Sequence, residues 1–94
     1  MTPLTVIHDA AAGRFQATVD GLACVADYRL VGTVMHIQHT EVPAALQGRG
    51  LAAALVQQVL AQARSQGWRV RPVCSYVRAY MQRHPETQDL LEAR

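Results

Sequence analysis

Two glycines and an arginine stand where an extended segment gives way to a helical one, and this junction is suited to binding an anion. The extended segment ends at Val42, and a helical pattern starts near Leu51. The first N–H groups of a helix lack intrahelical partners and carry a partial positive charge, and glycines let an anion approach the backbone. The sequence therefore predicts a diphosphate site formed by Gln47, Gly48, Arg49, Gly50, Leu51 and Ala52.

A second chemical signal is Cys74, which stands at the predicted start of the last helix. A partial positive charge at that position favours the thiolate and makes the sulfur nucleophilic. The alternative is that Cys74 is a small apolar side chain, as buried cysteines often are. Cys24 lies in an extended segment and is predicted to be a core residue.

The patterning of apolar residues predicts five strands and two helices that position these groups. Extended segments cover residues 4–7, 14–19, 22–30, 34–42 and 68–73, and helical spacing covers residues 47–66 and a segment from residue 74 or 75 to 84, with one further helical turn expected from Glu86. Asp20-Gly21 predicts a two-residue hairpin turn, Gly67 predicts the end of the first helix, and Pro72 places the fifth strand at an edge or a bulge.

The predicted order is therefore β-β-β-β-α-β-α, an α+β fold with a mixed, mostly antiparallel sheet. A right-handed β-α-β crossover is expected to place the first helix over the sheet and the fifth strand parallel to the fourth. Simple alternation along the fourth strand puts Val34, His36, Gln38 and Thr40 on one face, and Met35, Ile37, His39 and Glu41 on the other.

The composition limits the protein to a few classes. Residues 1–94 are expected to form one domain, and 50% hydrophobic with 17% charged residues suits a compact fold. The net charge of +2 comes from nine arginines scattered along the chain, so nucleic-acid binding is a minor alternative. The two cysteines are expected to be free thiols, and the lack of a targeting or membrane-spanning pattern predicts a cytoplasmic protein without a membrane partner.

A metal site is not expected either. The four histidines, at positions 8, 36, 39 and 84, lack the helical spacing of a zinc site, and alternation places His36 and His39 on opposite strand faces. Trp68 is predicted to pack beside the end of the first helix.

The junction resembles the coenzyme A pyrophosphate loop of the GNAT N-acetyltransferase superfamily, Gln/Arg-x-x-Gly-x-Gly/Ala, which Gln47, Gly50 and Ala52 match. Three further segments, residues 39–43, 72–74 and 80–86, are similar to a family of very short GNAT-like proteins. This resemblance covers about residues 14–86. It implies an acetyl-CoA co-substrate whose pantetheine arm lies between the fourth and fifth strands and pairs with backbone near Thr40, Glu41 and Val42.

The resemblance also implies roles in acetyl transfer. Tyr80 matches in position the tyrosine that many GNAT enzymes use to protonate the leaving thiolate, although it is equally expected as a half-buried core residue. His39 is the leading candidate for the general base and Glu41 is the alternative. In the structural interpretation, His39 instead hydrogen-bonds to the backbone and fixes the separation of the strands. Cys74 offers a second route through an acetyl-cysteine.

An ordinary GNAT domain has one or two helices between its first two strands, whereas only residues 9–13 fill that gap here. The acceptor side is therefore expected to be open, which suits an exposed amine such as a protein side chain or terminus. The sequence identifies neither the acceptor nor the oligomeric state. The competing hypothesis is a module that binds CoA or a protein partner without chemistry.

Overall fold

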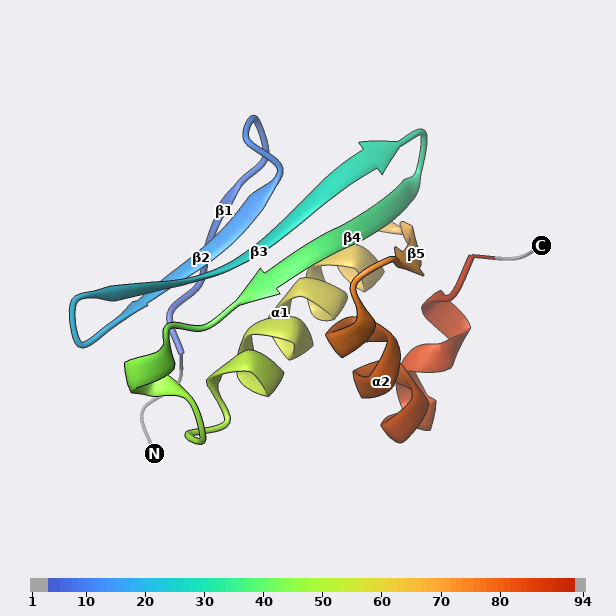
Figure 1. Cartoon of the computed structure of the whole chain (residues 1–94). Coiled ribbons are helices and arrows are strands. Elements are labelled where there is room, and N and C mark those ends of the chain that lie inside the picture. The colour runs from blue at the N-terminus through green and yellow to red at the C-terminus, as the bar shows by residue number, and fades with distance from the viewer. Residues whose placement is uncertain (1–3, 93–94) are drawn as a thin grey trace.

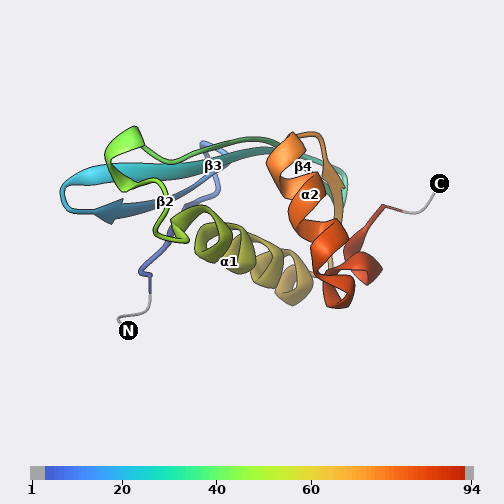
Figure 2. The same ribbon diagram turned by 60° about the horizontal axis from the view of Figure 1, so that its bottom comes forward.

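A five-stranded sheet carries both helices on one of its faces (Figures 1 and 2). The structure is a computed structural model and describes residues 4–92. Its strands are β1 (Ile7–Asp9), β2 (Arg14–Val19), β3 (Leu22–Val31), β4 (Val34–Glu41) and β5 (Arg69–Pro72). The helices are α1 (Leu51–Gln66) and α2 (Ser75–Arg83), with short 3-10 helices η1 (Ala44–Leu46) and η2 (Pro85–Leu90).

The strands lie side by side in chain order, antiparallel from β1 to β4 and parallel between β4 and β5. This arrangement confirms the predicted α+β order. Asp20 and Gly21 adopt positive φ values of 52° and 77°, as the predicted hairpin turn requires. β5 lies at the edge of the sheet, where Pro72 costs no ladder hydrogen bond, and Gly67 caps the end of α1 as expected.

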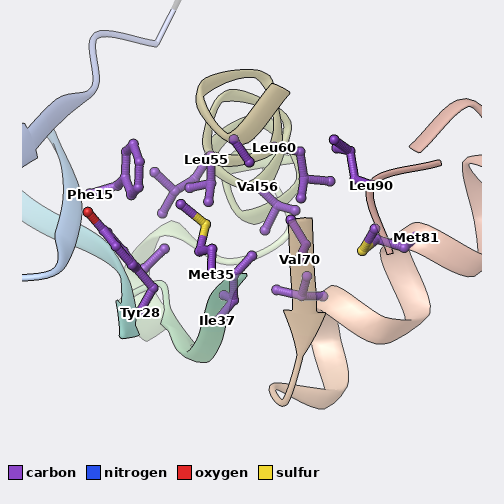
Figure 3. Packing of buried hydrophobic residues seen from close by; sticks show 14 of the residues in the cluster. Phe15, Tyr28, Met35, Ile37, Leu55, Val56, Leu60, Val70, Met81 and Leu90 are labelled. Carbon is purple, nitrogen blue, oxygen red and sulfur yellow. The ribbon is translucent and has the colours of Figure 1, made fainter. Parts of the chain in front are cut away.

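The core lies between the sheet and the two helices, as Figure 3 shows. Met35 and Ile37 from β4 meet Leu55 and Val56 from α1, and all four are at most 1% exposed. Val77 and Met81 close the core from α2, together with Leu90 from η2. Cys24 is fully buried and Trp68 packs against the core, so both predictions are confirmed.

A β-bulge at Gln38 corrects the predicted faces of β4. Tyr28 pairs with Ile37 and Asp27 pairs with His39, so Gln38 has no partner on β3. The extra residue changes the alternation of β4 beyond it. Thr40 therefore shares the helix-covered face with Met35 and Ile37, and His39 and Glu41 share the opposite, open face with His36. The prediction that His36 and His39 lie on opposite faces was wrong.

Two predicted boundaries also differ. The first strand is Ile7–Asp9 and not residues 4–7, because the Leu4 carbonyl accepts a hydrogen bond from Gln58 Nε2 at 2.7 Å and that segment leaves the sheet for α1. The first helix begins at Leu51 and not at Gln47. Gly48 and Gly50 have φ values of 83° and 74°, which are incompatible with a right-handed helix.

Candidate functional site

The gap between β4 and β5 opens where their pairing ends. The parallel ladder runs from Val34–Arg69 to Ile37–Pro72, and the N–H groups of Val73 and Cys74 then both donate to the Ile37 carbonyl, at 3.0 and 2.9 Å. The chain turns from there into α2, whereas β4 continues beside β3 to Glu41. Within the described chain, residues 39–41 thus have strand partners on one side only. Their other side can pair with an extended ligand.

The predicted anion loop lies at one end of this gap. Gly50 is the N-cap of α1 in the left-handed conformation, and the first backbone bond it accepts comes from Ala54 at 3.1 Å. No side chain caps the helix and its first turn has no acidic residue, so the N–H groups of residues 51–53 point outward without a backbone or side-chain partner. A Cβ at Gly48 or Gly50 would meet no atom within 4 Å, so these glycines are required by backbone conformation.

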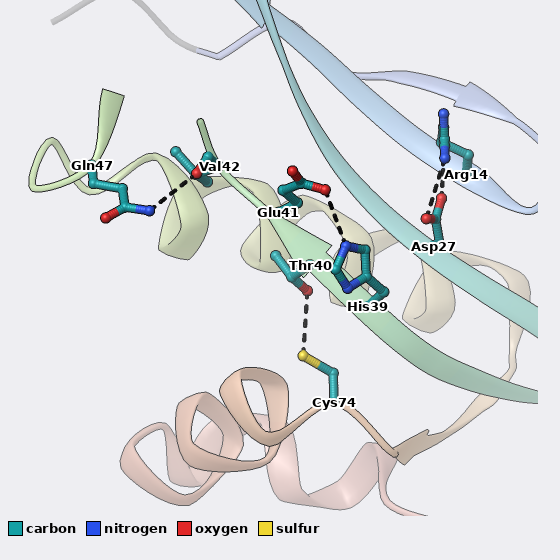
Figure 4. A network of polar contacts seen from close by, with 8 residues as sticks. All are labelled: Arg14, Asp27, His39, Thr40, Glu41, Val42, Gln47 and Cys74. Atoms are coloured by element: carbon teal, nitrogen blue, oxygen red, sulfur yellow. Dashed lines mark hydrogen bonds and ion pairs between the residues drawn. The ribbon is translucent and has the colours of Figure 1, made fainter. Parts of the chain in front are cut away.

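Two adjoining cavities form a groove from this loop toward the end of β4. The first, of about 220 Å³, lies over the loop and the start of α1, and the second, of about 260 Å³, reaches Thr40. They share four lining residues: Val42, Gln47, Ala52 and Tyr76. Gln47 Nε2 donates to the Val42 carbonyl at 3.3 Å, which ties the loop to the strand (Figure 4). The groove therefore joins the backbone N–H groups at the start of α1 to a largely apolar channel.

The groove ends beside Cys74, whose thiol lies 3.8 Å from the Thr40 hydroxyl (Figure 4). Cys74 is the N-cap of α2, as predicted. Burial acts to raise the pKa of this thiol, but hydrogen bonds from the Val77 and Tyr76 backbone and from the Thr40 side chain outweigh it and hold the pKa below its ordinary value. Cys74 is consequently a free thiol poised to ionise.

Cys24 provides the contrast. It is fully buried, and desolvation raises the pKa of its thiol. The two cysteines thus differ in the balance between burial and hydrogen bonding, which explains why only Cys74 is a candidate nucleophile.

His39 and Glu41 project from β4 on the face opposite Thr40, as Figure 4 shows. His39 Nε2 lies 3.2 Å from Glu41 Oε1, and both side chains are more than half exposed. The bulge at Gln38 therefore distributes the candidate groups over both faces of one strand: an acid–base pair on the open face and Thr40 with Cys74 beneath it. A ligand in the gap between β4 and β5 lies between them.

Tyr80 lies in a different cavity. That cavity, of about 170 Å³, is bounded by α1, α2 and η2, and its lining includes Gln57, Arg64 and Thr87 but neither Thr40 nor Ala52. The Tyr80 ring stacks on His84 with centroids 3.9 Å apart, and burial, followed by the charge of Glu86, raises the pKa of its hydroxyl. The structure does not bring Tyr80 to the groove, and its role as the acid stays a prediction.

Tyr76 is the groove residue that sequence reasoning missed. It stands one helical turn before Tyr80 and lines both cavities of the groove with a partly exposed ring. Its position in the first turn of α2, two residues after Cys74, was the available signal. An amphipathic aromatic ring there suits contact with an extended ligand.

Arg49 is engaged within the protein. Its guanidinium donates to Asp20 Oδ2 at 2.8 Å, so the turn between β2 and β3 supplies a counter-charge to the loop. Arg49, predicted as part of the diphosphate site, is therefore in an ion pair, with half of its side chain still exposed.

Residues 4–92 contain no group of three or more His, Cys, Asp or Glu side chains suited to hold a metal ion. No helix in the same range has the length and apolarity needed to span a bilayer.

Comparisons with known proteins agree with this geometry. The family model described as GCN5-related N-acetyltransferase matches residues 14–90. Protein NATD1 from Mus musculus is 32% identical over 91 residues, covering 94% of this chain and 83% of that protein, and NATD1 from Homo sapiens has the same identity and covers 80% of its length.

A solution structure of a GCN5-like protein from Staphylococcus aureus superposes with a TM-score of 0.75, at 23% identity, over all of this chain and 93% of that one. That likeness shows the fold. With the match of the family model over most of the chain, the conclusion is that this protein belongs to the GCN5-related N-acetyltransferase family.

Proposed function

We propose that the protein binds acetyl-CoA in the groove and transfers the acetyl group to an exposed amine. The observation that carries the proposal is the continuity of the groove, which runs from the start of α1 to Thr40, whose hydroxyl lies 3.8 Å from the Cys74 thiol. Family membership supports acyl transfer in general.

The residues of the groove fit the parts of acetyl-CoA. N–H groups at a helix N-terminus bind a diphosphate, and the backbone of residues 39–41, paired on one side only, can pair with pantetheine amides. Val42, Ala52 and Tyr76 supply apolar contacts to the arm. When bound, acetyl-CoA supplies an activated acetyl thioester.

In direct transfer, the open face of β4 supplies the base. His39 accepts a proton from the attacking ammonium so that the amine lone pair can bond to the carbonyl carbon, and Glu41 holds the imidazole by its 3.2 Å contact. The C–S bond breaks as the new C–N bond forms, and the leaving CoA thiolate takes up the second proton that the nitrogen gives up as it becomes an amide. The backbone near the end of β4 offers N–H donors to the carbonyl oxygen.

A covalent route is also consistent with the geometry, because the pKa of Cys74 is lowered and the thiol borders the groove. In this route the Cys74 thiolate forms a C–S bond to the acetyl carbon and the CoA thiolate leaves and is protonated. An amine then displaces Cys74, which regains a proton. Both routes give an amide and free CoA.

Binding is the first test. Acetyl-CoA at one hundred times its Kd stabilises a protein that binds it only when folded by about 2.7 kcal/mol, which a thermal shift detects. Gly50→Val should abolish the shift, because a β-branched residue is strongly disfavoured at positive φ and crowds the anion. Gly32→Val, at a turn remote from the groove, is the matched control.

Turnover is the second test. Release of free thiol from acetyl-CoA in the presence of an amine panel is expected, and Cys74→Ala distinguishes the routes. An acetyl adduct that maps to Cys74 and turnover lost in Cys74→Ala support the covalent route, whereas turnover retained in that variant but lost in His39→Gln supports direct transfer. Binding without turnover for any amine would instead identify a non-catalytic module.

A further inference from the structure

A row of basic residues crosses the open face of the sheet. Arg29 on β3 pairs in register with His36 on β4, which pairs with Arg71 on β5. Side chains directly opposite each other on neighbouring strands lie close together. Within the described residues, Arg29 and His36 form no side-chain hydrogen bond or ion pair. Arg29 therefore brings to this basic row a permanent positive charge that no described residue pairs with, and an external anion would pair with it.

The neighbouring row toward the end of β4 has a different charge pattern. Acidic and basic residue types alternate across four strands in this row: Asp9, Arg14, Asp27 and His39. Arg14 Nε contacts Asp27 Oδ1 at 2.7 Å, and Glu41 adds a carboxylate one row further on. The open face is therefore polarised, with a basic end at the basic row and carboxylates near the end of β4.

The chain itself shows which anion the basic row accepts. Leu91 forms a parallel bridge with Val70, which carries the following residue, Glu92, along the outer edge of β5. Glu92 Oε1 lies 2.6 Å from Arg71 Nε. A carboxylate from an extended segment thus already satisfies one end of the row, while Arg29 and His36 carry no such partner within the described chain.

We infer that the open face docks an extended, acidic peptide segment whose amino group reaches His39 and Glu41. The placement of the amino group at His39 and Glu41 rests on the proposed acetyl transfer, whereas the docking of the peptide does not. Along β3, Asp27 lies two residues from Arg29 in the basic row, a distance of about 7 Å. Val25, the partner of Glu41, lies four residues from Arg29, a distance of about 13 Å. An extended acceptor with a free α-amine therefore places its acidic side chains at about the third to fifth residue.

The same charges argue against a nucleic acid on this face. Asp9, Asp27 and Glu41 would repel a phosphate backbone, and no Phe, Tyr or Trp stands among the open-face residues of the five strands to stack on bases. The three carboxylates favour the ammonium end of a peptide instead. The polarity of the face thus matches a dipolar ligand.

Fluorescence anisotropy without acetyl-CoA tests the docking. The probe is a seven-residue peptide with a free amino terminus, glutamates at its third to fifth positions and a dye at its carboxyl end. At low salt it should bind at least tenfold more tightly than the same peptide with lysines there. Arg29→Gln should weaken binding about fivefold, the upper range for an exposed charge pair. Glu92→Gln should tighten it, because Arg71 then loses its internal carboxylate.

The matched control is Arg83→Gln, which removes the same charge from the last turn of α2, away from the open face. It should leave binding unchanged. Three results would each overturn the inference. The acidic and lysine peptides would bind equally, or Arg83→Gln would weaken acidic-peptide binding as much as Arg29→Gln does. The third is a single-stranded oligonucleotide that binds more tightly than the acidic peptide and loses its binding in Arg29→Gln. If the acidic peptide binds but is not acetylated, the proposed function is refuted and the docking stands. If both peptides bind equally and are acetylated equally, the docking is refuted and the proposed function stands.

Discussion

The two faces of the sheet are built from the same strands and have opposite characters. The helix-covered face carries Phe15, Tyr28, Met35 and Ile37, each at most 8% exposed and packed on α1 and α2. The open face carries the ion pair of Arg14 with Asp27 and the polar contact of His39 with Glu41. The difference shows that burial specifies the register of the strands, while the open face is free to carry chemistry.

The faces come together functionally at one place. Beyond the bulge at Gln38, Thr40 turns toward Cys74 on the helix side and His39 turns toward the open side. β5 has ended there, so no neighbouring strand separates the two faces. A reactive group in that gap is accessible to a thiol from one face and to an acid–base pair from the other.

The largest expected effect breaks the packed face. Ile37→Ala should lower the free energy of unfolding by about 2–5 kcal/mol, because the side chain is 1% exposed and its loss leaves a cavity in the core. Ile7→Ala on the open face, where the side chain is 69% exposed, should cost less than about 0.5 kcal/mol. Urea denaturation measures both, and similar losses would contradict the division into two faces.

Deleting Gln38 addresses the junction between the faces. Without this residue Ile37 and His39 become consecutive, so the ladder with β3 becomes regular and every side chain keeps its face. The chain should fold, but loss of the local bend should narrow the gap and weaken acetyl-CoA binding at least tenfold, or about 1.4 kcal/mol. Gln38→Ala keeps the bulge and is the control. Calorimetric binding that is unchanged in the deletion variant would show that the bend is not needed.

The two thiols give a smaller contrast between the groove and the core. Hydrogen bonds lower the pKa of Cys74 and burial raises that of Cys24, so at any pH below the ordinary thiol pKa the thiolate fraction is larger at Cys74. Iodoacetamide should therefore modify Cys74 first, and its rate should rise with pH at lower values than for a free thiol. Thr40→Val removes one hydrogen bond and should move this profile to higher pH. Thr18→Val, an exposed position on β2, should leave it in place.

Much of the fold followed from local sequence signals. Asp20-Gly21 fixed a hairpin turn through its positive φ requirement, and Pro72 marked an edge strand because it lacks an N–H donor. The loop that precedes α1 followed from two glycines before a helical pattern, and the position of Cys74 followed from the start of α2. Each of these features depends on residues that are close in the chain.

The features that the sequence did not reveal come from non-local pairing. The bulge at Gln38 depends on how Tyr28 and Asp27 pair across the sheet, and strict alternation along β4 does not reveal it. The pairing of Arg49 with Asp20 and the separation of Tyr80 from the groove likewise arise from segments far apart in the chain. Tyr76 was missed because its partners Val42 and Ala52 come from two other elements.

The smallest expected effect concerns the charge of the anion loop. Asp20 already neutralises part of the Arg49 charge, so a diphosphate must compete with this carboxylate for the guanidinium. Asp20→Asn should tighten acetyl-CoA binding about two- to fivefold, since exposed ion pairs contribute little and asparagine tolerates the positive φ of the turn. Asp89→Asn, which removes the partner of Arg64 elsewhere, should have no such effect. Weaker acetyl-CoA binding in Asp20→Asn would mean instead that Asp20 holds Arg49 in the orientation that the diphosphate needs. The β2–β3 turn would then be part of the diphosphate site.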